Sequence, residues 1–416
     1  MSMDMESLRE ALRTDLDEEY VDEHSIYEEK DIPTVLSTPH TITALFVGFA
    51  ALAAYLFMSK MPETLEGQVF RAIKVICFGV VLFFVFQGKD IIFQRPHPVF
   101  WRCLNAVQLL YGCFMLFLAF MPLDITRGIL NKIDPITGIE TVAERDYMGD
   151  CSVKWVNIKP IIDDEFFFAH IIGWHMKALI LRDYKMLWIT SILFEFVELT
   201  FKHVLVNFSE CWWDSWVIDV LLCNGLGIHF GMITCEYLSI KTFSWLKPKD
   251  RKKKEAGKSF VSRKINLVAP YSFTSYHWGM FESMRRFFGA TLVMIMLEVV
   301  DLNAFWWKSI LLVPTTHNWN LYRLLLWFLS SLLGAAELYE WATKRKAKLR
   351  QSAWLALFMV LSEILFIARH SGYLFIGKPK MYWKYWMWAV GLGLWVTYGA
   401  ISRIRERRNM KKLKNE

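Results

Sequence analysis

Residues 207–227 read NFSECWWDSWVIDVLLCNGLG, a run of tryptophans and aliphatic side chains that three acids and an amide interrupt. The acids are Glu210, Asp214 and Asp219, and the amide is Asn224. An ionisable side chain near the centre of a bilayer costs about 2.5–3.5 kcal/mol on insertion scales, so such groups usually mark functional sites. Whether this segment lies in a membrane therefore decides both the fold class and the meaning of its polar residues.

The composition of the whole chain is that of a membrane protein. Of 416 residues, 54% are hydrophobic and only 21% are charged, and 19 are tryptophans. A helix that spans a bilayer needs roughly 20 mostly apolar residues. Blocks of adequate length occur at 41–59, 70–88, 100–121, 165–182, 186–204, 214–238, 285–313, 319–341, 352–370 and 382–402. The sequence therefore predicts an all-α, polytopic integral membrane protein with about ten transmembrane helices.

Clusters of basic residues predict its orientation. They lie at 249–258, 344–350 and 403–414, after the sixth, eighth and tenth spans, and so on one side of a ten-span arrangement. The positive-inside rule makes that side cytosolic, which places both termini in the cytosol and residues 207–213 on the lumenal or outer side. Beside membrane spans, such clusters indicate topology and contact with anionic lipid headgroups, and we expect no nucleic-acid partner.

The chain divides by composition into three parts. Residues 1–38 are acidic and have no early apolar core, so we expect a cytosolic arm and no cleaved signal peptide. Residues 39–402 form the membrane domain, with a candidate functional core at about 165–238 and a basic cytosolic loop at about 239–284. Residues 403–416 form a basic cytosolic tail, whose KLKNE ending fits a lysine-based retrieval signal of the endoplasmic reticulum.

Polar residues of the fourth to sixth spans are expected to converge in the lumenal half of the membrane. The rise of 1.5 Å per residue places each of them in the lumenal half of its span. A single acid could lie at the interface or in a salt bridge, but a group requires mutual contacts, water or a metal. The ionisable members are His170, Lys177, Glu195, Glu198, Glu210, Asp214 and Asp219.

The spacing within the sixth span does not suit a regular helix. Asp214, Asp219 and Asn224 are five residues apart, which on an α-helix turns each by about 140° from the last. They share one stripe only if the helix is irregular. Gly225 and Gly227 make a local distortion possible.

The residue types favour metal-assisted chemistry on a phosphodiester. Carboxylate and amide oxygens suit Ca²⁺, Mg²⁺ or Mn²⁺ and not zinc. Such an ion could polarise a phosphodiester oxygen, and His170 has a pKa suited to general base catalysis near neutrality. A lone histidine is more often an interfacial residue, but the neighbouring acids favour a catalytic one. Cys151 and Cys211 both fall in predicted lumenal loops, where a disulfide could form.

Three segments closely resemble the eukaryotic base-exchange phosphatidylserine synthases. They are NFSECWWDSWVIDVLLCNGLGI (207–228), FFFAHIIGWHMKALILR (166–182) and RPHPVFWR (95–102). The resemblance implies a multi-pass enzyme of the endoplasmic reticulum membrane that replaces the headgroup of a phospholipid with L-serine. It also implies Ca²⁺ as cofactor, with Mn²⁺ as an alternative, and no nucleotide. ERDYMGDC (144–151) and NGLGI (224–228) look more like the members that use phosphatidylethanolamine than those that use phosphatidylcholine.

The family's functional positions match residues of this cluster, and the roles that follow are a working hypothesis motivated by the cluster. In our working hypothesis the catalytic residues are His170, as general base, and Asp219, which orients it. The remaining assignments are Glu198, Glu210 and Asp214 as Ca²⁺ ligands, Glu195, Asn207 and Asn224 as substrate-binding residues, and Arg95 as part of a regulatory lipid site. An alternative mechanism has His170 attack phosphorus directly and form a phosphatidyl-histidine intermediate.

Several alternatives remain at this level. An ion-coupled transporter also places acids in the membrane, but it predicts internal repeats, which the sequence lacks. A CDP-alcohol phosphotransferase requires an Asp-Gly motif, and no Asp-Gly pair occurs in the chain. The partners expected are a phospholipid and L-serine, and the sequence leaves a homodimer open.

Overall fold

The computed structural model describes residues 97–139, 150–239, 276–344, 347–379 and 382–415, apart from residue 281, together with most of 47–88 and residue 93. The chain separates into two compact units, residues 1–88 and residues 89–416. The first unit contains α3 (Leu65–Gln87), which begins where the Thr64 side chain accepts a hydrogen bond from the Gly67 amide. Its 23 residues are long enough to cross a bilayer.

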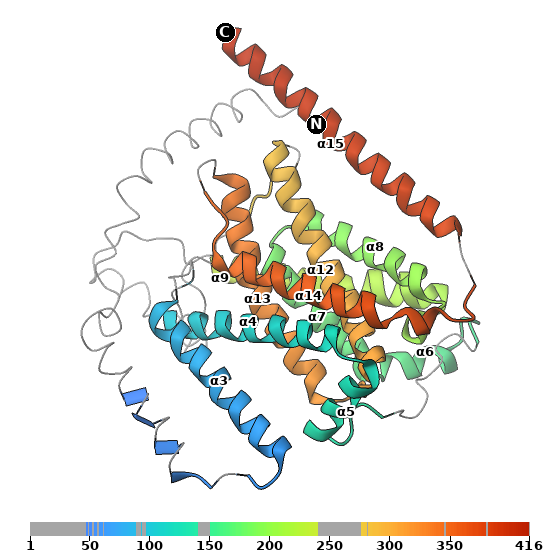
Figure 1. The fold of residues 1–416 in the computed structure, drawn as a ribbon. Coiled ribbons are helices and arrows are strands. Elements are labelled where there is room, and N and C mark those ends of the chain that lie inside the picture. Colours follow the sequence, from blue (N-terminus) through green and yellow to red (C-terminus); the bar gives the residue numbers. More distant parts are fainter. Residues whose placement is uncertain are drawn as a thin grey trace, which may run out of the picture. The chain divides into compact units, whose positions relative to one another are not determined.

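The second unit is all-helical in the part that the structure describes (Figure 1). Its long helices begin at side chains that cap the free amides of the first turn, such as Asp183 before α8 and Ser283 before α12. Its elements are α4 (Pro98–Phe120), α5 (Leu123–Ile133), α6 (Trp155–Ile162), α7 (Glu165–Leu181), α8 (Tyr184–Phe201), η2 (Val206–Phe208), η3 (Asp214–Asn224), α9 (Gly225–Ser239), α12 (Met284–Leu311), α13 (Asn318–Thr343), α14 (Gln351–His370), η4 (Gly372–Phe375) and α15 (Tyr382–Asn415).

Two groups of packed helices build this unit. In one group α4 lies along α14, and both α12 and α13 pack against α14 (Figure 1). In the other, α7 packs against α9 and η3, while α8 contacts α7, α9 and η3. Contacts of α13 with α7 and of α12 with α8 join the two groups. The candidate functional core is thereby enclosed by the second group and by one side of α12.

Two glycines allow α9 to approach α7 closely. A Cβ atom on Gly227 would lie 2.5 Å from the carbonyl oxygen of Ile171, and one on Gly231 would lie 2.5 Å from the Cβ of Ala178. Any side chain at these positions would push the two helices apart. Gly227 therefore serves the packing of α9 against α7.

Six helices of the described residues are long and apolar enough to cross a membrane. They are Glu66–Val85, Pro98–Phe120, Asp214–Tyr237, Met284–Leu311, Asn318–Thr343 and Gln351–His370. The shorter helix Phe167–Leu181 is also apolar. Large apolar side chains such as Phe117, Phe120, Leu321 and Leu325 are exposed on these helices, as expected of surfaces that face lipid. The chain is thus a polytopic membrane protein.

The ten spans and the orientation of the termini stay predictions. Most of the first predicted span and nearly all of the basic loop at 239–284 lie outside the described residues. The fifth predicted span corresponds to α8, which contains Glu195 and Glu198. The tenth corresponds to α15, which continues through the basic tail to Asn415. The apolar-block pattern does not predict the short helices α5 and α6, because neither reaches membrane-spanning length.

A buried ion pair crosses the first helix group. Arg323 of α13 donates to Glu363 of α14 from Nε at 3.0 Å and from Nη2 at 2.7 Å. Glu363 also accepts from Asn303 of α12, from Trp327 of α13 and from Tyr111 of α4. The side chains of Arg323 and Glu363 are 3% and 0% exposed, so one carboxylate links four helices away from water.

Candidate active site

Residues 214–224 form a π-helix that continues into α9. In a π-helix each amide bonds to the carbonyl five residues earlier, so residues five apart lie closer to one face than they do on an α-helix. Asp214, Asp219 and Asn224 have this spacing, and all three are buried. The unusual winding therefore reduces the mismatch that a regular helix presents, and it brings the three polar side chains closer to one face. Gly225 caps this segment with ordinary α-helical angles (φ −58°, ψ −47°), and its amide donates to the Val220 carbonyl five residues earlier.

The π-helix brings Asp219 against His170 of α7. The Nδ1 atom of His170 lies 2.8 Å from Oδ1 of Asp219, 49 residues further along the chain. A carboxylate accepts, so Nδ1 carries the proton of a neutral imidazole in this pair and Nε2 holds the free lone pair. The pair thus has the arrangement of an oriented base, with Nε2 as the atom able to take a proton.

The acids of α8 adjoin this pair. Glu195 is buried and interacts electrostatically with Asp219, His170 and Asp214. Glu198 is half-buried and interacts with Glu210 and with Glu195. The five carboxyl groups therefore form one cluster, which a bound cation would stabilise.

Glu210 belongs to the loop that leads into the π-helix. Burial, followed by the nearby Asp219, Asp214 and Glu195, raises the pKa of its carboxyl well above the usual value. Ser215 donates a hydrogen bond to its Oε2 atom over 3.3 Å. The Glu210 carboxyl thus occupies a position where its negative charge is unfavourable without a cation.

Two buried oxygens in the cluster have no hydrogen-bond partner. They are Oδ1 of Asp214 and Oδ1 of Asn224, whereas Nδ2 of Asn224 donates to Ser191 of α8 over 3.0 Å. Buried oxygens of this kind normally have a partner, and both are of the type that Ca²⁺ or Mn²⁺ binds. No three His, Cys, Asp or Glu side chains in the described part of the chain are gathered closely enough to hold a metal ion. The donor types fit the metal, and Glu198, Glu210 and Asp214 as its ligands stay a prediction.

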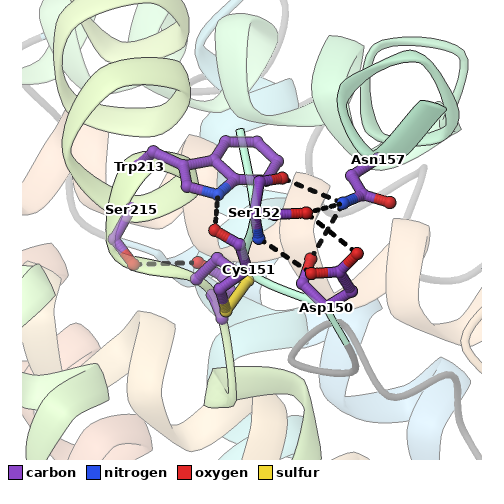
Figure 2. The surroundings of a disulfide bond; sticks show 8 residues. Asp150, Cys151, Ser152, Asn157, Trp213 and Ser215 are labelled. Carbon is purple, nitrogen blue, oxygen red and sulfur yellow. Dashed lines mark hydrogen bonds between the residues drawn. A yellow bond between two sulfur atoms is a disulfide. The ribbon is translucent and has the colours of Figure 1, made fainter. Parts of the chain in front are cut away.

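A disulfide closes the loop that carries Glu210. Cys211 is bonded to Cys151, a pairing that the sequence left open. Figure 2 shows the indole of Trp213 over the Cys151 carbonyl, to which Nε1 donates over 3.1 Å. In the segment before α6, Ser152 donates to Asp150, which lowers the pKa of that carboxyl to about 2. The disulfide therefore fixes the segment before the π-helix to the segment before α6.

Two further predicted residues lie apart from this arrangement. Oδ1 of Asn207 accepts a hydrogen bond from Nζ of Lys308 on α12 over 3.0 Å. Its carbonyl oxygen is thus engaged with a buried cation, and its role in substrate binding stays a prediction. Arg95 lies outside the described residues.

The structure adds two acids of α12 that the site hypothesis omitted. Asp301 forms an ion pair with Lys177 of α7 over 2.5 Å. Glu298 is buried and interacts electrostatically with Lys177, Asp301 and Glu195. Two acids three residues apart within the apolar block 285–313 were the signal that could have indicated them.

The comparisons with known proteins find a phosphatidylserine synthase family and relatives named as phosphatidylserine synthases or serine phosphatidyltransferases. A family model described as Phosphatidyl serine synthase matches residues 96–371. Phosphatidylserine synthase 2 of Rattus norvegicus is 35% identical over 346 residues, which cover 80% of this chain and 72% of that protein. The Homo sapiens protein of the same name is 34% identical over 347 residues, which cover 80% and 69%. CDP-diacylglycerol–serine O-phosphatidyltransferase 2 of Oryza sativa subsp. japonica is 32% identical over 375 residues, which cover 86% and 87%.

The family match includes every element that builds the candidate site, from α7 through the π-helix to α12. It also includes the disulfide and the buried ion pair of the first helix group. The motifs around His170 and Asp219, the arrangement of their helices and these relatives lead to one conclusion: this chain belongs to the phosphatidylserine synthase family.

Proposed function

We propose that this protein is a phosphatidyltransferase that makes phosphatidylserine by replacing the ethanolamine of phosphatidylethanolamine with L-serine. The family assignment supports phosphatidylserine synthesis in a membrane-embedded enzyme. The observation that carries the chemistry is the 2.8 Å contact between His170 and Asp219 within a cluster of buried carboxyl groups. An oriented base beside oxygen ligands for a divalent cation suits transfer at a phosphodiester.

In the direct mechanism, Nε2 of His170 removes the proton from the serine hydroxyl. The serine oxygen attacks phosphorus, one phosphorus–oxygen bond forms, and the bond to the ethanolamine oxygen breaks. His170 then returns its proton to that leaving oxygen, so the donor lipid supplies all the energy of the new bond. Asp219 stabilises the imidazolium between these two steps.

In the alternative mechanism, Nε2 attacks phosphorus and serine resolves a phosphatidyl-histidine intermediate. Ethanolamine release without serine, or an adduct trapped on His170, would favour this route. The absence of both during turnover would favour direct transfer.

The donor types of the same site suit a divalent cation. Bound by Glu198, Glu210 and Asp214, Ca²⁺ would neutralise the acids and polarise a phosphate oxygen, with Mn²⁺ as a substitute. The unpartnered Oδ1 of Asp214 supports this set. We assign substrate positioning to Glu195, which interacts electrostatically with His170 and Asp219. We assign the same role to Asn224, the last residue of the π-helix.

We further propose that the site faces the lumen of the endoplasmic reticulum. Disulfides form and persist in oxidising compartments, and the bond between Cys151 and Cys211 adjoins Glu210 directly. The basic clusters at 249–258, 344–350 and 403–414 support a cytosolic location for the opposite loops. A homodimer is compatible with this arrangement, and Arg95 is proposed as part of a regulatory lipid site.

The plant relatives give one specific reason for a second candidate donor, because their printed name specifies CDP-diacylglycerol. The chain has no Asp-Gly pair, so a CDP-alcohol phosphotransferase motif is absent from it. Phosphatidylcholine is a third donor with the same chemistry. The family assignment leaves the ion-coupled transporter without support.

The test is incorporation of labelled L-serine by purified protein in liposomes. The liposomes contain phosphatidylethanolamine, phosphatidylcholine or CDP-diacylglycerol, each with Ca²⁺ or a chelator, and His170→Ala serves as the inactive control. Calcium-dependent product from phosphatidylethanolamine alone supports the proposal in full. Product from CDP-diacylglycerol alone, or product from folded His170→Ala at the wild-type rate, would overturn it.

A further inference from the structure

Glu298 of α12 is a buried carboxyl group without a hydrogen-bond partner. Glu298 is 6% exposed, and neither Oε1 nor Oε2 has a hydrogen-bond partner. A buried acid normally accepts hydrogen bonds or faces a cation, because desolvation of its oxygens is otherwise uncompensated. A ligand that supplies a cationic donor would complete this position.

The charges around Glu298 come from three helices. Lys177 of α7 is the nearby cation, and Asp301 of α12 and Glu195 of α8 are the nearby acids. The ammonium of Lys177 is already held by Asp301 over 2.5 Å and lies 3.8 Å from the centre of the Trp174 ring. Lys177 is therefore fixed beside Glu298 by other contacts, and it does not bond to the Glu298 oxygens.

Lys177 of this group lies on the same face of α7 as the proposed base. His170 and Lys177 are seven residues apart on α7, which places them on one face about 10.5 Å apart along the helix axis. The Lys177 ammonium lies over the ring of Trp174, which is three residues nearer to His170 on the same helix. Glu195 interacts with both His170 and Glu298, so it connects the two positions.

We propose that Lys177, Glu298 and Asp301 form the subsite for the amino-acid end of L-serine, an inference that rests on the proposed function. Glu298 accepts hydrogen bonds from the serine ammonium, and Lys177, held by Asp301, donates to the serine carboxylate. The hydroxymethyl group of the same molecule then extends toward His170. Ethanolamine has the ammonium but not the carboxylate, so Glu298 serves both amino alcohols whereas Lys177 serves serine alone.

The test compares two nucleophiles on one donor lipid. Labelled L-serine and labelled ethanolamine are each exchanged into phosphatidylethanolamine liposomes, and KM is measured for both. A charge-assisted hydrogen bond contributes enough that its loss raises KM roughly ten- to a hundredfold. Glu298→Gln is expected to raise both KM values by a similar factor. The double variant Lys177→Met with Asp301→Asn, which leaves neither charge unpaired, is expected to raise the ratio of the serine KM to the ethanolamine KM about tenfold or more.

Two controls separate binding from folding. Glu337→Gln removes a buried acid of α13 that accepts from the Ala353 amide outside the subsite, and it should leave both KM values within twofold. With wild-type protein, L-serine methyl ester, which lacks the carboxylate charge, should have a KM about tenfold above that of L-serine. This last measurement needs no variant and stands even if the substitutions unfold the protein.

Equal KM values for serine and its methyl ester, or an unchanged ratio in the folded double variant, would overturn the carboxylate position. Wild-type KM values in folded Glu298→Gln would overturn the ammonium position. If the wild-type protein exchanges neither labelled nucleophile, the proposed function itself fails, a result distinct from failure of the subsite.

Discussion

Replacement of Asp219 by asparagine tests the central pair of the site. Asp219→Asn keeps the size of the side chain and an oxygen within reach of His170 Nδ1, which lies 2.8 Å from Oδ1 in the wild type. It removes the negative charge. That charge matters because His170 becomes a cation when it takes the serine proton, and an adjacent carboxylate stabilises the imidazolium.

The expected size of the effect follows from the geometry. Two unit charges about 4 Å apart attract by about 4 kcal/mol at an effective dielectric constant of about 20. The His170 side chain is 38% exposed and that of Asp219 is 10% exposed, so water screens part of this energy. A remaining loss of about 2–3 kcal/mol lowers kcat roughly 30- to 150-fold.

The assay is labelled-serine incorporation in phosphatidylethanolamine liposomes, with kcat measured at saturating serine and at the Ca²⁺ concentration that saturates the wild type. Asp163→Asn is the matched control, because Asp163 lies at the end of α6 and its side chain is 58% exposed in an ion pair with Lys159. A kcat for folded Asp219→Asn within threefold of the wild type would refute the reasoning. Recovery of the wild-type kcat at higher Ca²⁺ would show that Asp219 acts on the metal and not on His170.

Four further predictions address the metal, the disulfide and the ion pair. Chelation of divalent cations should abolish serine incorporation, and adding back Ca²⁺ or Mn²⁺ should restore it; full activity in the chelator would contradict a metal site. Because the raised pKa of Glu210 keeps its carboxyl protonated to higher pH than usual, the rate at limiting Ca²⁺ should rise with pH, and Glu210→Gln should lose this rise. Cys151→Ser should lower the thermal unfolding midpoint, since a disulfide typically contributes about 2–4 kcal/mol, and a reductant should then lower the midpoint of the wild type but not of the variant. Glu363→Leu should reduce the free energy of unfolding by about 3–5 kcal/mol because it leaves Arg323 buried without a counter-charge, and adding Arg323→Leu should restore part of that loss; a double variant no more stable than Glu363→Leu would contradict this account.

The sequence by itself determined the class of the protein. Apolar blocks of spanning length, such as 100–121 and 352–370, predict membrane helices because burial in lipid depends on local composition. The same local patterns identified His170 and the acids of the fourth to sixth spans, because charges inside apolar segments are costly and therefore stand out. The motifs around them indicated the family.

Only the tertiary structure decided how these residues are paired. The π-helix of 214–224 brings Asp214, Asp219 and Asn224 closer to one face. Their five-residue spacing indicated an irregular helix, but nothing local in the sequence specified which irregular form it takes. The pairing of Asp219 with His170 depends on how α7, α8 and the π-helix pack, which is a property of contacts between distant segments. The same holds for Asn207 with Lys308, 101 residues apart, since a side chain's partner is chosen by the fold and not by its neighbours in the chain.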